Sequence, residues 1–265
     1  MKHRLRVRGF TLLEITVVLF ILGLLIAGLF GPLETQLEAR DRRQTQDALE
    51  RIVEALGGFA ITERRLPCPD ADGDGRADPV FDPGDPASAA CTVTVGLLPW
   101  SDLGVAPADA WGNLFTYAVS NPAYTRPESD GLCNGNDAPA HFDLCSTGTL
   151  TVQGRGDNPA TAGSEGKFLL ATYATGLPAV VLSHGRNGFG ARSATGVILP
   201  APAGGDEREN ADGDAVFMAR GYARDAAGCS DDANESTPLC EYDDLVAWLA
   251  PSILNGRMVS AGRLP

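Results

Sequence analysis

The sequence lacks the residue patterns on which most enzymes and zinc sites depend. Its three histidines stand far apart, at positions 3, 141 and 184, and no Cys-x-x-Cys pair is present, which disfavours a structural zinc site. There is no Gly-x-Ser-x-Gly elbow, no phosphate loop and no dinucleotide-binding fingerprint. Ser183 and His184 are neighbours in the chain, and adjacency alone does not place a nucleophile and a base in triad geometry. We therefore expect a protein that is not an enzyme.

Positive charge is also scarce. The 265 residues include 21 Lys and Arg against 34 Asp and Glu, which gives a formal net charge of −13, and four of the basic residues stand before residue 9. An acidic body makes nucleic acid unlikely as the main partner, and anionic lipid equally so, because both would repel it. The length is sufficient for one large or two small domains with a hydrophobic core.

Charge is almost absent between Phe10 and Phe30, where Glu14 is the one ionisable side chain in 21 residues. At about 1.5 Å of rise per residue, a helix of this length crosses the roughly 30 Å hydrocarbon core of a bilayer. Basic residues precede this segment and an acidic body follows it, an arrangement that places the body outside the cytoplasm. We predict one transmembrane helix over residues 10–30, with the N-terminus in the cytoplasm.

Residues 8–14 read Arg-Gly-Phe-Thr-Leu-Leu-Glu, which resembles the N-terminus of type IV prepilins and type II secretion pseudopilins. The resemblance implies that a prepilin peptidase cuts after Gly9, that the new terminal Phe10 is N-methylated, and that Glu14 pairs with the amine of Phe10. A carboxylate and an ammonium attract strongly in a low dielectric, whereas either alone is penalised there. Phe10 and Glu14 are thus expected to act in assembly. The alternative is an ordinary N-terminal anchor that carries this sequence by chance.

The same resemblance implies the surroundings of the protein. Its partners are expected to be the prepilin peptidase, other pilin or pseudopilin subunits and an inner-membrane assembly platform. The chain is expected to cross the inner membrane once and to place its body in the periplasm. The tip subunit of that family typically lacks the glutamate, so Glu14 favours a shaft or near-tip subunit.

Two further segments are similar to parts of the major type II secretion pseudopilin. Residues 109–117 read Asp-Ala-Trp-Gly-Asn-Leu-Phe-Thr-Tyr, and residues 183–190 read Ser-His-Gly-Arg-Asn-Gly-Phe-Gly. In the family this C-terminal part leads into a calcium-binding loop, whose nearest equivalent here is the acidic stretch from Asp206 to Asp214. The resemblance therefore leaves open a calcium site with Asp212 and Asp214 as ligands.

A separate calcium argument comes from the residues themselves. Residues 70–78 read Asp-Ala-Asp-Gly-Asp-Gly-Arg-Ala-Asp, with carboxylates at relative positions 1, 3, 5 and 9 and a glycine at position 6. Alternate oxygens of such a loop converge on one hard cation, and the glycine allows the sharp turn. Position 12 is Phe81 rather than glutamate, so an EF-hand is disfavoured. We expect calcium at Asp70, Asp72, Asp74 and Asp78, with a solvated acidic turn as the alternative.

Six cysteines in an exported body favour disulfides. Sequence alone permits 15 connectivities. Clustering along the chain favours Cys68–Cys91, Cys133–Cys145 and Cys229–Cys240. Each pair closes a loop rich in Gly, Asp, Asn or Pro, and each closure stabilises the fold by about 3 kcal/mol in the chain-entropy model.

The pattern after the apolar segment predicts a second, amphipathic stretch of helix. Its apolar residues share one helix face, which suits packing on a sheet: Leu49, Ile52, Val53, Leu56 and Ala60. Gly31-Pro32 should bend or loosen the helix, and Pro67 ends it at the latest, so its end lies between residues 57 and 66. The chain thus divides into a cleaved leader (1–9), a transmembrane and assembly helix (10–30), an amphipathic helix (31–66) and a globular domain (67–265).

Beyond Pro67, short apolar runs alternate with turn clusters, which favours an antiparallel sheet over alternating β-α units. The predicted strands are 92–98, 113–120, 148–153, 167–175, 179–182, 197–199 and 215–219. Short helices are predicted at 243–249 and 253–259. The expected fold class is α+β: a long N-terminal transmembrane helix packed on an antiparallel β-sheet, pilin-like, with large disulfide-closed loops.

These predictions describe a structural subunit of a type II secretion pseudopilus or a related type IV pilus-like filament, assembled through its N-terminal helix. The alternative is a surface-binding minor pilin whose loops recognise a host, a substrate or DNA. An anchored hydrolase is a third hypothesis, which the absent catalytic motifs disfavour.

Overall fold

The computed structural model describes residues 11–82, 85–126, 142–155, 170–224, 226–231 and 237–264, without the side chains of residues 25–34 and 81–90. The chain divides into two compact units, Met1–Arg43 and Gln44–Pro265. One helix, α1 (Leu12–Glu63), begins in the first unit and ends in the second. Among the described residues, none of the helices combines the length and the apolar character that a membrane crossing requires.

Helix α1 ends where the sequence predicts. The pair Gly31-Pro32 does not interrupt it, and neither does Gly57-Gly58. The helix stops after Glu63 because Arg64 takes a left-handed φ of 64°, while its backbone N–H still donates to the carbonyl oxygen of Ala60 at 2.8 Å. The predicted apolar face is confirmed, since four of its five members are buried: Leu49, Ile52, Leu56 and Ala60.

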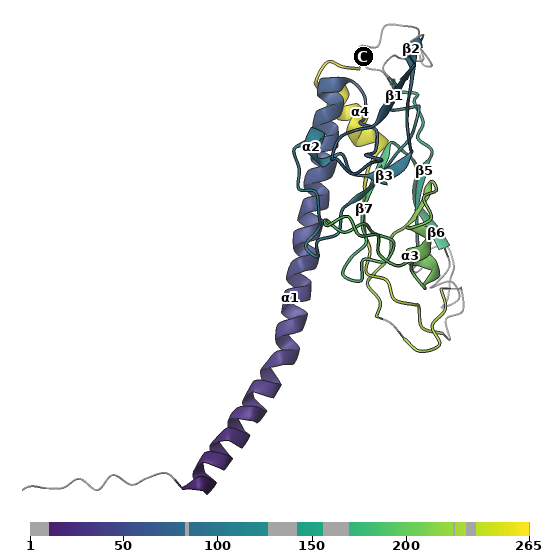
Figure 1. The fold of residues 1–265 in the computed structure, drawn as a ribbon. Helices are drawn as coiled ribbons and strands as arrows, with labels where there is room; N and C mark the ends of the chain where they lie inside the picture. Colours follow the sequence, from purple (N-terminus) through teal and green to yellow (C-terminus); the bar gives the residue numbers. More distant parts are fainter. Residues whose placement is uncertain are drawn as a thin grey trace, which may run out of the picture. The chain divides into compact units, whose positions relative to one another are not determined.

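A four-stranded antiparallel sheet forms the centre of the second unit (Figure 1). Its order is β3 (Val95–Leu97), β4 (Thr116–Val119), β7 (Ala179–Ser183) and β9 (Leu245–Leu249). All five residues of β7 are buried, because this strand is central and both faces of the sheet are covered. The predicted antiparallel sheet is therefore confirmed.

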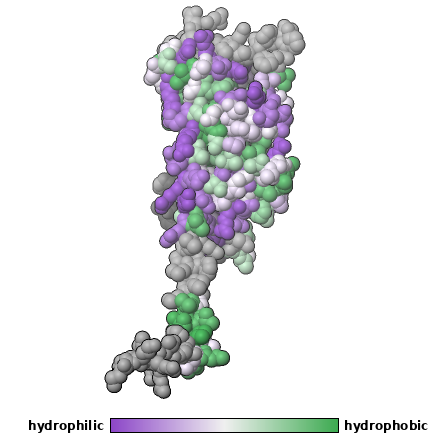
Figure 2. Space-filling view, turned by 60° about the vertical axis from the view of Figure 1, so that its left-hand side comes forward, coloured by the Kyte–Doolittle hydropathy of each residue, from purple (hydrophilic) through white to green (hydrophobic). Residues whose placement is uncertain are grey.

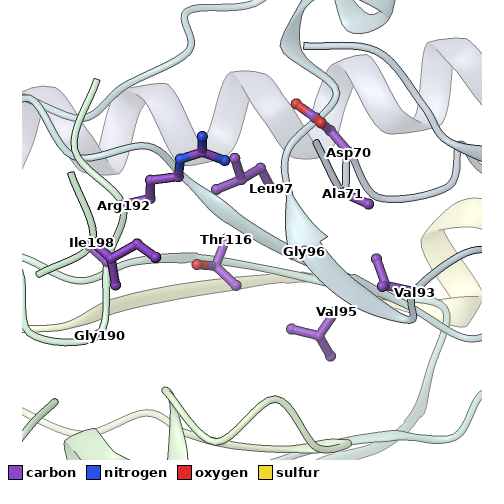
Figure 3. A pocket seen from close by; sticks show the side chains of 11 residues that line it. Asp70, Ala71, Val93, Val95, Gly96, Leu97, Thr116, Gly190, Arg192 and Ile198 are labelled. Atoms are coloured by element: carbon purple, nitrogen blue, oxygen red, sulfur yellow. The ribbon is translucent and has the colours of Figure 1, made fainter. Parts of the chain in front are cut away.

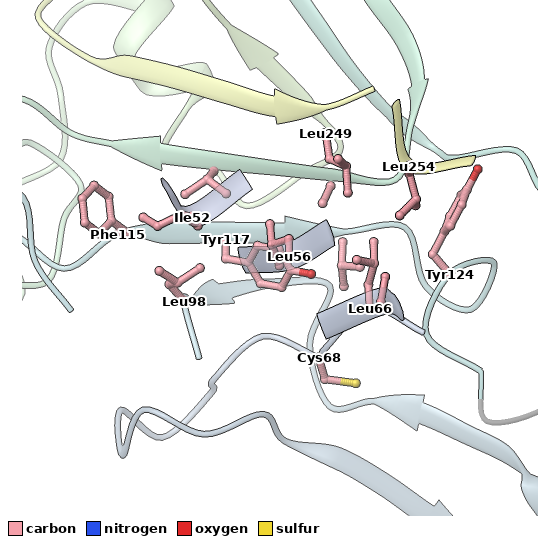
Figure 4. Close-up of a cluster of buried hydrophobic side chains, with 14 of the residues drawn as sticks. Ile52, Leu56, Leu66, Cys68, Leu98, Phe115, Tyr117, Tyr124, Leu249 and Leu254 are labelled. Carbon is pink, nitrogen blue, oxygen red and sulfur yellow. The ribbon is translucent and has the colours of Figure 1, made fainter. Parts of the chain in front are cut away.

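Each face of this sheet has its own hydrophobic core. The core on the α1 face includes Ile52, Leu56, Tyr117, Val119 and Val181 (Figure 4). The core on the opposite face includes Ala118, Leu150, Val152, Val180 and Phe217. Since side chains alternate along a strand, neighbouring residues of β4 and β7 enter different cores.

The opposite face is covered by a second, three-stranded sheet. Its order is β6 (Leu170–Leu177), β5 (Leu150–Arg155) and β8 (Val216–Met218), with β5 antiparallel to β6 and parallel to β8. A small hairpin joins β1 (Pro79–Asp82) and β2 (Asp85–Cys91). The remaining helices are α2 (Trp100–Leu103), α3 (Gly205–Glu209) and α4 (Pro251–Ser260).

Helix α4 packs against the last turns of α1. Its buried Leu254 and Met258 join the core on the α1 face, which confirms the predicted helix at 253–259. Arg257 pairs with Glu54 and lies over Gly57, where an added Cβ would stand 2.8 Å from Nη1 of Arg257. The glycine at this position thus leaves room for the arginine.

Two predicted elements are wrong. Residues 243–249 were expected to form a helix, yet Leu245–Leu249 form strand β9, paired with β7. Its side chains alternate, with Leu245 and Leu249 in one core and Trp248 packed against the other. Alternation of this kind is the pattern of a strand between two cores, and a short apolar run alone does not distinguish it from a helix. Residues 197–199 do not form a strand but make a single bridge between Ile198 and Arg192. The hairpin at 79–91 was not predicted.

Two of the predicted disulfides are confirmed. Cys68 is bonded to Cys91 with a Cα–Cα distance of 5.2 Å, and Cys229 is bonded to Cys240 with a Cα–Cα distance of 4.8 Å. Cys145 is also disulfide-bonded. Cys133, its predicted partner, lies outside the described residues, so that pair stays a prediction.

Candidate functional site

The N-terminal processing residues Gly9 and Phe10 lie outside the described residues, but Glu14 is described. It occupies the third position of α1, directly after the N-cap residue Thr11 and two leucines. One carboxylate oxygen of Glu14 accepts hydrogen bonds from the backbone N–H and the hydroxyl of Thr11, both at 3.2 Å, and the N–H of Glu14 donates to that hydroxyl. This reciprocal pair is a capping box. The spacing Thr-x-x-Glu before an apolar run is its sequence signal.

The first turns of α1 expose a large apolar surface. Figure 2 shows it at the N-terminal end of the described helix, and its members are about half to four-fifths exposed: Leu12, Leu13, Ile15, Val17, Val18, Leu19, Phe20, Ile21, Leu22 and Leu24. Isolated exposed apolar residues are ordinary, whereas a contiguous set marks a surface that lipid or another protein covers.

The two segments that resemble the major pseudopilin lie side by side. Asp109 accepts hydrogen bonds at 2.9 Å from the backbone N–H groups of Trp111 and Asn113, and its Oδ2 accepts from the hydroxyl of Ser183 at 2.7 Å. The side-chain amide of Asn113 donates to the carbonyl oxygen of Gly185 at 2.9 Å. Burial raises the pKa of Asp109, and these hydrogen bonds oppose the rise. The segments therefore brace each other at the ends of β4 and β7.

His184 is buried in this junction at 1% exposure. Its Nε2 lies 3.1 Å from the hydroxyl of Thr116, and its Nδ1 is buried without a hydrogen-bond partner among the described residues. Burial lowers the pKa of His184 to about 4, so the ring is neutral at physiological pH. Ser183 and His184 thus have different hydrogen-bond partners, Asp109 and Thr116.

In the 70–78 loop, the structure brings three of the four predicted ligands together. Asp70, Asp72 and Asp78 each offer a carboxylate oxygen within 4.8 Å of the others, and Asp74 is not in this group. Asp70 is fully buried, and its two oxygens accept from the backbone N–H groups of Gly73 and Gly75 at 2.6 and 2.8 Å. These hydrogen bonds hold the loop in shape without a cation. The loop can therefore be either a calcium site or a solvated acidic turn.

A hollow of about 320 Å³ lies beside Asp70. Arg192 and Ile198 line it from one side and Val93 and Val95 from the other (Figure 3). The guanidinium of Arg192 also lies next to the loop, where Nη1 donates to the carbonyl oxygen of Asp72 at 3.4 Å. A cation of the protein itself therefore stands near these aspartates.

A second group of carboxylates is buried, and the sequence does not predict it. Glu207, Asp243 and Asp244 each offer a carboxylate oxygen within 4.8 Å of the others, and the three residues are only 2–3% exposed. We call these three residues the buried acidic cluster. The sequence places Glu207 in the acidic stretch from Asp206 to Asp214 and predicts a helix from Asp243. The spacing of positions 207 and 243 does not indicate that these residues meet.

The buried acidic cluster is held mainly by amide groups. Glu207 Oε1 accepts from the backbone N–H of Asp243 at 3.0 Å, and Asp243 Oδ2 accepts from the backbone N–H of Asn187 at 2.8 Å. Asp244 Oδ2 accepts from the side-chain amide of Asn210 at 2.8 Å. The other oxygen of Asp244 is buried without a hydrogen-bond partner among the described residues.

Burial makes the charged forms of the buried acidic cluster costly. It raises the pKa of Glu207 to about 7, with the Asp243 carboxylate adding to the rise, and it raises the pKa of Asp244 well above its ordinary range. The guanidinium of Arg220 opposes the rise in the pKa of Asp244, and protons or a bound cation would offset more of the negative charge. The three carboxylates offer an all-oxygen donor set, which suits a hard cation such as calcium.

The third group consists of Glu209, Asp212 and Asp214, whose carboxylate oxygens also lie within 4.8 Å of one another. Asp212 and Asp214 are exposed. Each accepts a hydrogen bond from a backbone N–H two residues later, at 3.1 and 2.7 Å. Water can therefore solvate these charges, unlike those of the buried acidic cluster.

Comparison with known proteins adds one finding. Residues 4–30 match the family model described as the prokaryotic N-terminal methylation motif. This motif is the prepilin cleavage and methylation signal of type IV pilin-like proteins, and it includes Gly9, Phe10 and Glu14. The resemblance predicted from residues 8–14 is thus confirmed. No curated protein and no solved structure matches the chain.

Proposed function

We propose that this chain is a structural, non-enzymatic subunit of a type II secretion pseudopilus or a related type IV pilus-like filament. The observation that carries the proposal is the methylation motif at residues 4–30. That motif implies processing by a prepilin peptidase and assembly with other pilin subunits. The exposed apolar residues between Leu12 and Leu24 support the same role, because they need lipid or neighbouring helices to cover them.

In this proposal the apolar N-terminal segment crosses the inner membrane once, and the body lies in the periplasm. The disulfides Cys68–Cys91 and Cys229–Cys240 support an oxidising compartment. The inner-membrane assembly platform extracts the cleaved subunit into the filament. Phe10 supplies the cationic amine, and Glu14 supplies the carboxylate that pairs with it.

Intact-mass analysis of membrane-extracted protein tests the processing step. The mature chain should begin at N-methylated Phe10, because the motif places the cut after Gly9. A chain that keeps Met1 in cells with the active peptidase contradicts the proposal.

Substitution of Glu14 tests the assembly step. Glu14→Leu should leave membrane insertion intact, because it removes a polar group from an apolar segment, and should lower the filament yield by leaving the Phe10 amine unpaired. Thr11→Val is the matched control, since it breaks the capping box and keeps the carboxylate. Normal filament yield with Glu14→Leu, or an equal loss with Thr11→Val, excludes the proposed pairing.

A surface-binding minor pilin is the second candidate function. The hollow beside Asp70 favours it, because ligand sites combine apolar walls with a few charged groups, and here Val93, Val95 and Ile198 stand beside Arg192. The acidic body disfavours DNA as that ligand. Neighbouring genes discriminate the two candidates, since one belongs in a secretion operon and the other in a pilus operon.

We also propose that the folded body binds calcium at the buried acidic cluster. The oxygen of Asp244 that is buried without a hydrogen-bond partner among the described residues supports this site. Glu207, Asp243 and Asp244 are the candidate ligands. The cation would neutralise charges that burial otherwise penalises.

A further inference from the structure

Helix α3 connects the buried acidic cluster to the second sheet through two consecutive side chains. Glu207 points into the cluster, where its carboxylate accepts from the side-chain amide of Asn187 at 3.0 and 3.2 Å. Asp206 points the other way and accepts from Nε of Arg155, the last residue of β5, at 2.9 Å. Arg220, two residues after β8, pairs with the same Asp206 carboxylate at 2.6 Å.

Asn210, the residue after α3, makes a second connection. Its side-chain amide donates to Oδ2 of Asp244 at 2.8 Å and to the carbonyl oxygen of Met218 in β8 at 3.0 Å. Its side-chain oxygen accepts from the backbone N–H of Met218 at 2.7 Å. One buried amide thus bonds both to the cluster and to strand β8, at 3% exposure.

The disulfide loop between Cys229 and Cys240 is joined to the same helix. Asp231 Oδ2 accepts from the backbone N–H of Asp206 at 3.1 Å, and Asp231 Oδ1 accepts from the backbone N–H of Cys240 at 3.0 Å. Arg220 bonds to both Asp231 and the carbonyl oxygen of Cys240. Helix α3 is therefore the common partner of the cluster, the second sheet and this loop.

We propose that a divalent cation in the buried acidic cluster fixes the second sheet and the disulfide-bonded segments 226–231 and 237–240 to the four-stranded sheet, with Glu207 as the ligand that α3 supplies. This inference rests on the calcium site of the proposed function. Asp243 and Asp244 directly precede β9 of the four-stranded sheet, whereas Glu207 lies in α3, between β7 and β8. A cation bound to all three draws the two parts together.

The direction of the coupling follows from the charges. Without a cation, Glu207 is desolvated beside two other carboxylates, so its ionised form favours movement of α3 towards water. Such movement also displaces Asp206 and Asn210, which hold β5 and β8. With a cation bound, the Glu207 carboxylate instead favours the position of α3 that the structure shows. Asp206 and Asn210 are positioning residues in this scheme, and Glu207 is the ligand.

Hydrogen exchange of the full chain in detergent, with excess calcium chloride or excess chelator, tests the coupling. Calcium should slow amide exchange at least tenfold in residues 150–155, 216–218 and 237–240, as well as in 243–245. Glu207→Gln should weaken calcium binding at least about tenfold, since even supporting residues of metal sites cost that much when lost. It should also abolish the calcium-dependent protection of β5 and β8. Glu209→Gln, the same change in the same helix, is the control and should behave like the wild type.

Each contrary outcome has a distinct meaning. Calcium binding with protection confined to residues 183–188 and 243–245 overturns the coupling and leaves the cation site. No calcium binding by the wild type overturns the cation site and this inference with it, while cleavage after Gly9 still decides the filament proposal. Loss of binding in Glu209→Gln but not in Glu207→Gln overturns the inference and moves the site to the exposed group at 209–214. The wild-type comparison needs no variant, so it holds even if Glu207→Gln folds poorly.

Discussion

Lowering the pH from 7 to 5 should destabilise the folded body through His184. The unfolded chain takes up a proton on this residue near its ordinary pKa of 6.5, whereas the folded chain does so only near 4. Between these values the unfolded state binds more protons than the folded state. The contribution of His184 to the free energy of unfolding is therefore complete above pH 6.5 and is lost as the pH falls towards 4. The cause is burial, since the ring is 1% exposed.

The magnitude follows from the two pKa values. Each factor of ten in proton affinity corresponds to about 1.4 kcal/mol, so the full loss is about 3 kcal/mol and the loss by pH 5 is about 2 kcal/mol. The free energy of unfolding of the full chain in detergent can be measured by urea titration at both pH values, with calcium kept constant. His184→Gln keeps a polar side chain that cannot titrate. Between pH 7 and 5 the variant should therefore lose about 2 kcal/mol less of its free energy of unfolding than the wild type does.

The difference between wild type and His184→Gln isolates this residue. Glu207 and Asp244 have raised pKa values, so they contribute the opposite slope, yet they are present in both proteins and cancel. His184→Asn is a second variant in case glutamine does not fit the cavity. An equal loss of stability in wild type and both variants would refute the reasoning.

Two further predictions concern the loop at 70–78 and the docking of α4. Calcium at a hundredfold excess over Kd should stabilise the folded body by about 2.7 kcal/mol and so raise its melting temperature. The double substitution Asp72→Ala with Asp74→Ala should leave most of that rise intact. A gain that disappears would assign the cation to that loop, and no effect of chelation on the wild type would leave its aspartates as a solvated turn. In α1, Gly58→Ala should stabilise the helix by up to about 1 kcal/mol, because nothing lies within 4 Å of the new Cβ. Gly57→Ala should gain less or lose stability, because its Cβ meets Arg257 and disturbs the pair with Glu54; equal effects of the two substitutions in thermal unfolding would contradict this account.

The sequence predicts best where the signal is local. The apolar face around Ile52 and Leu56 and two close cysteine pairs need only short spacings, and the structure confirms them. Strand β9 fails for the opposite reason. A five-residue apolar run does not distinguish helix from strand, and its pairing partner β7 lies more than sixty residues away in the chain.

The candidate site shows the same limit. The 70–78 loop is visible as a spacing pattern, because all of its ligands lie within nine residues. The buried acidic cluster joins Glu207 to Asp243 and Asp244 across a long segment that contains β8 and a disulfide loop. No local pattern encodes that contact. It arises because α3 packs beside β8 and because β9 returns to the edge of β7.

The capping box of α1 has a consequence for the life of a subunit before use. Thr11 and Glu14 both lie after the predicted cut, so cleavage removes no atom of the cap. The carboxylate therefore has a neutral partner in the precursor and in the processed chain, and an idle subunit need not carry a fully bare charge among apolar neighbours. If the segment lies in a membrane, as proposed above, this carboxylate has hydrogen-bond donors without any second subunit. In the proposed filament, assembly would then exchange one partner of this carboxylate, Thr11, for another, the amine of Phe10.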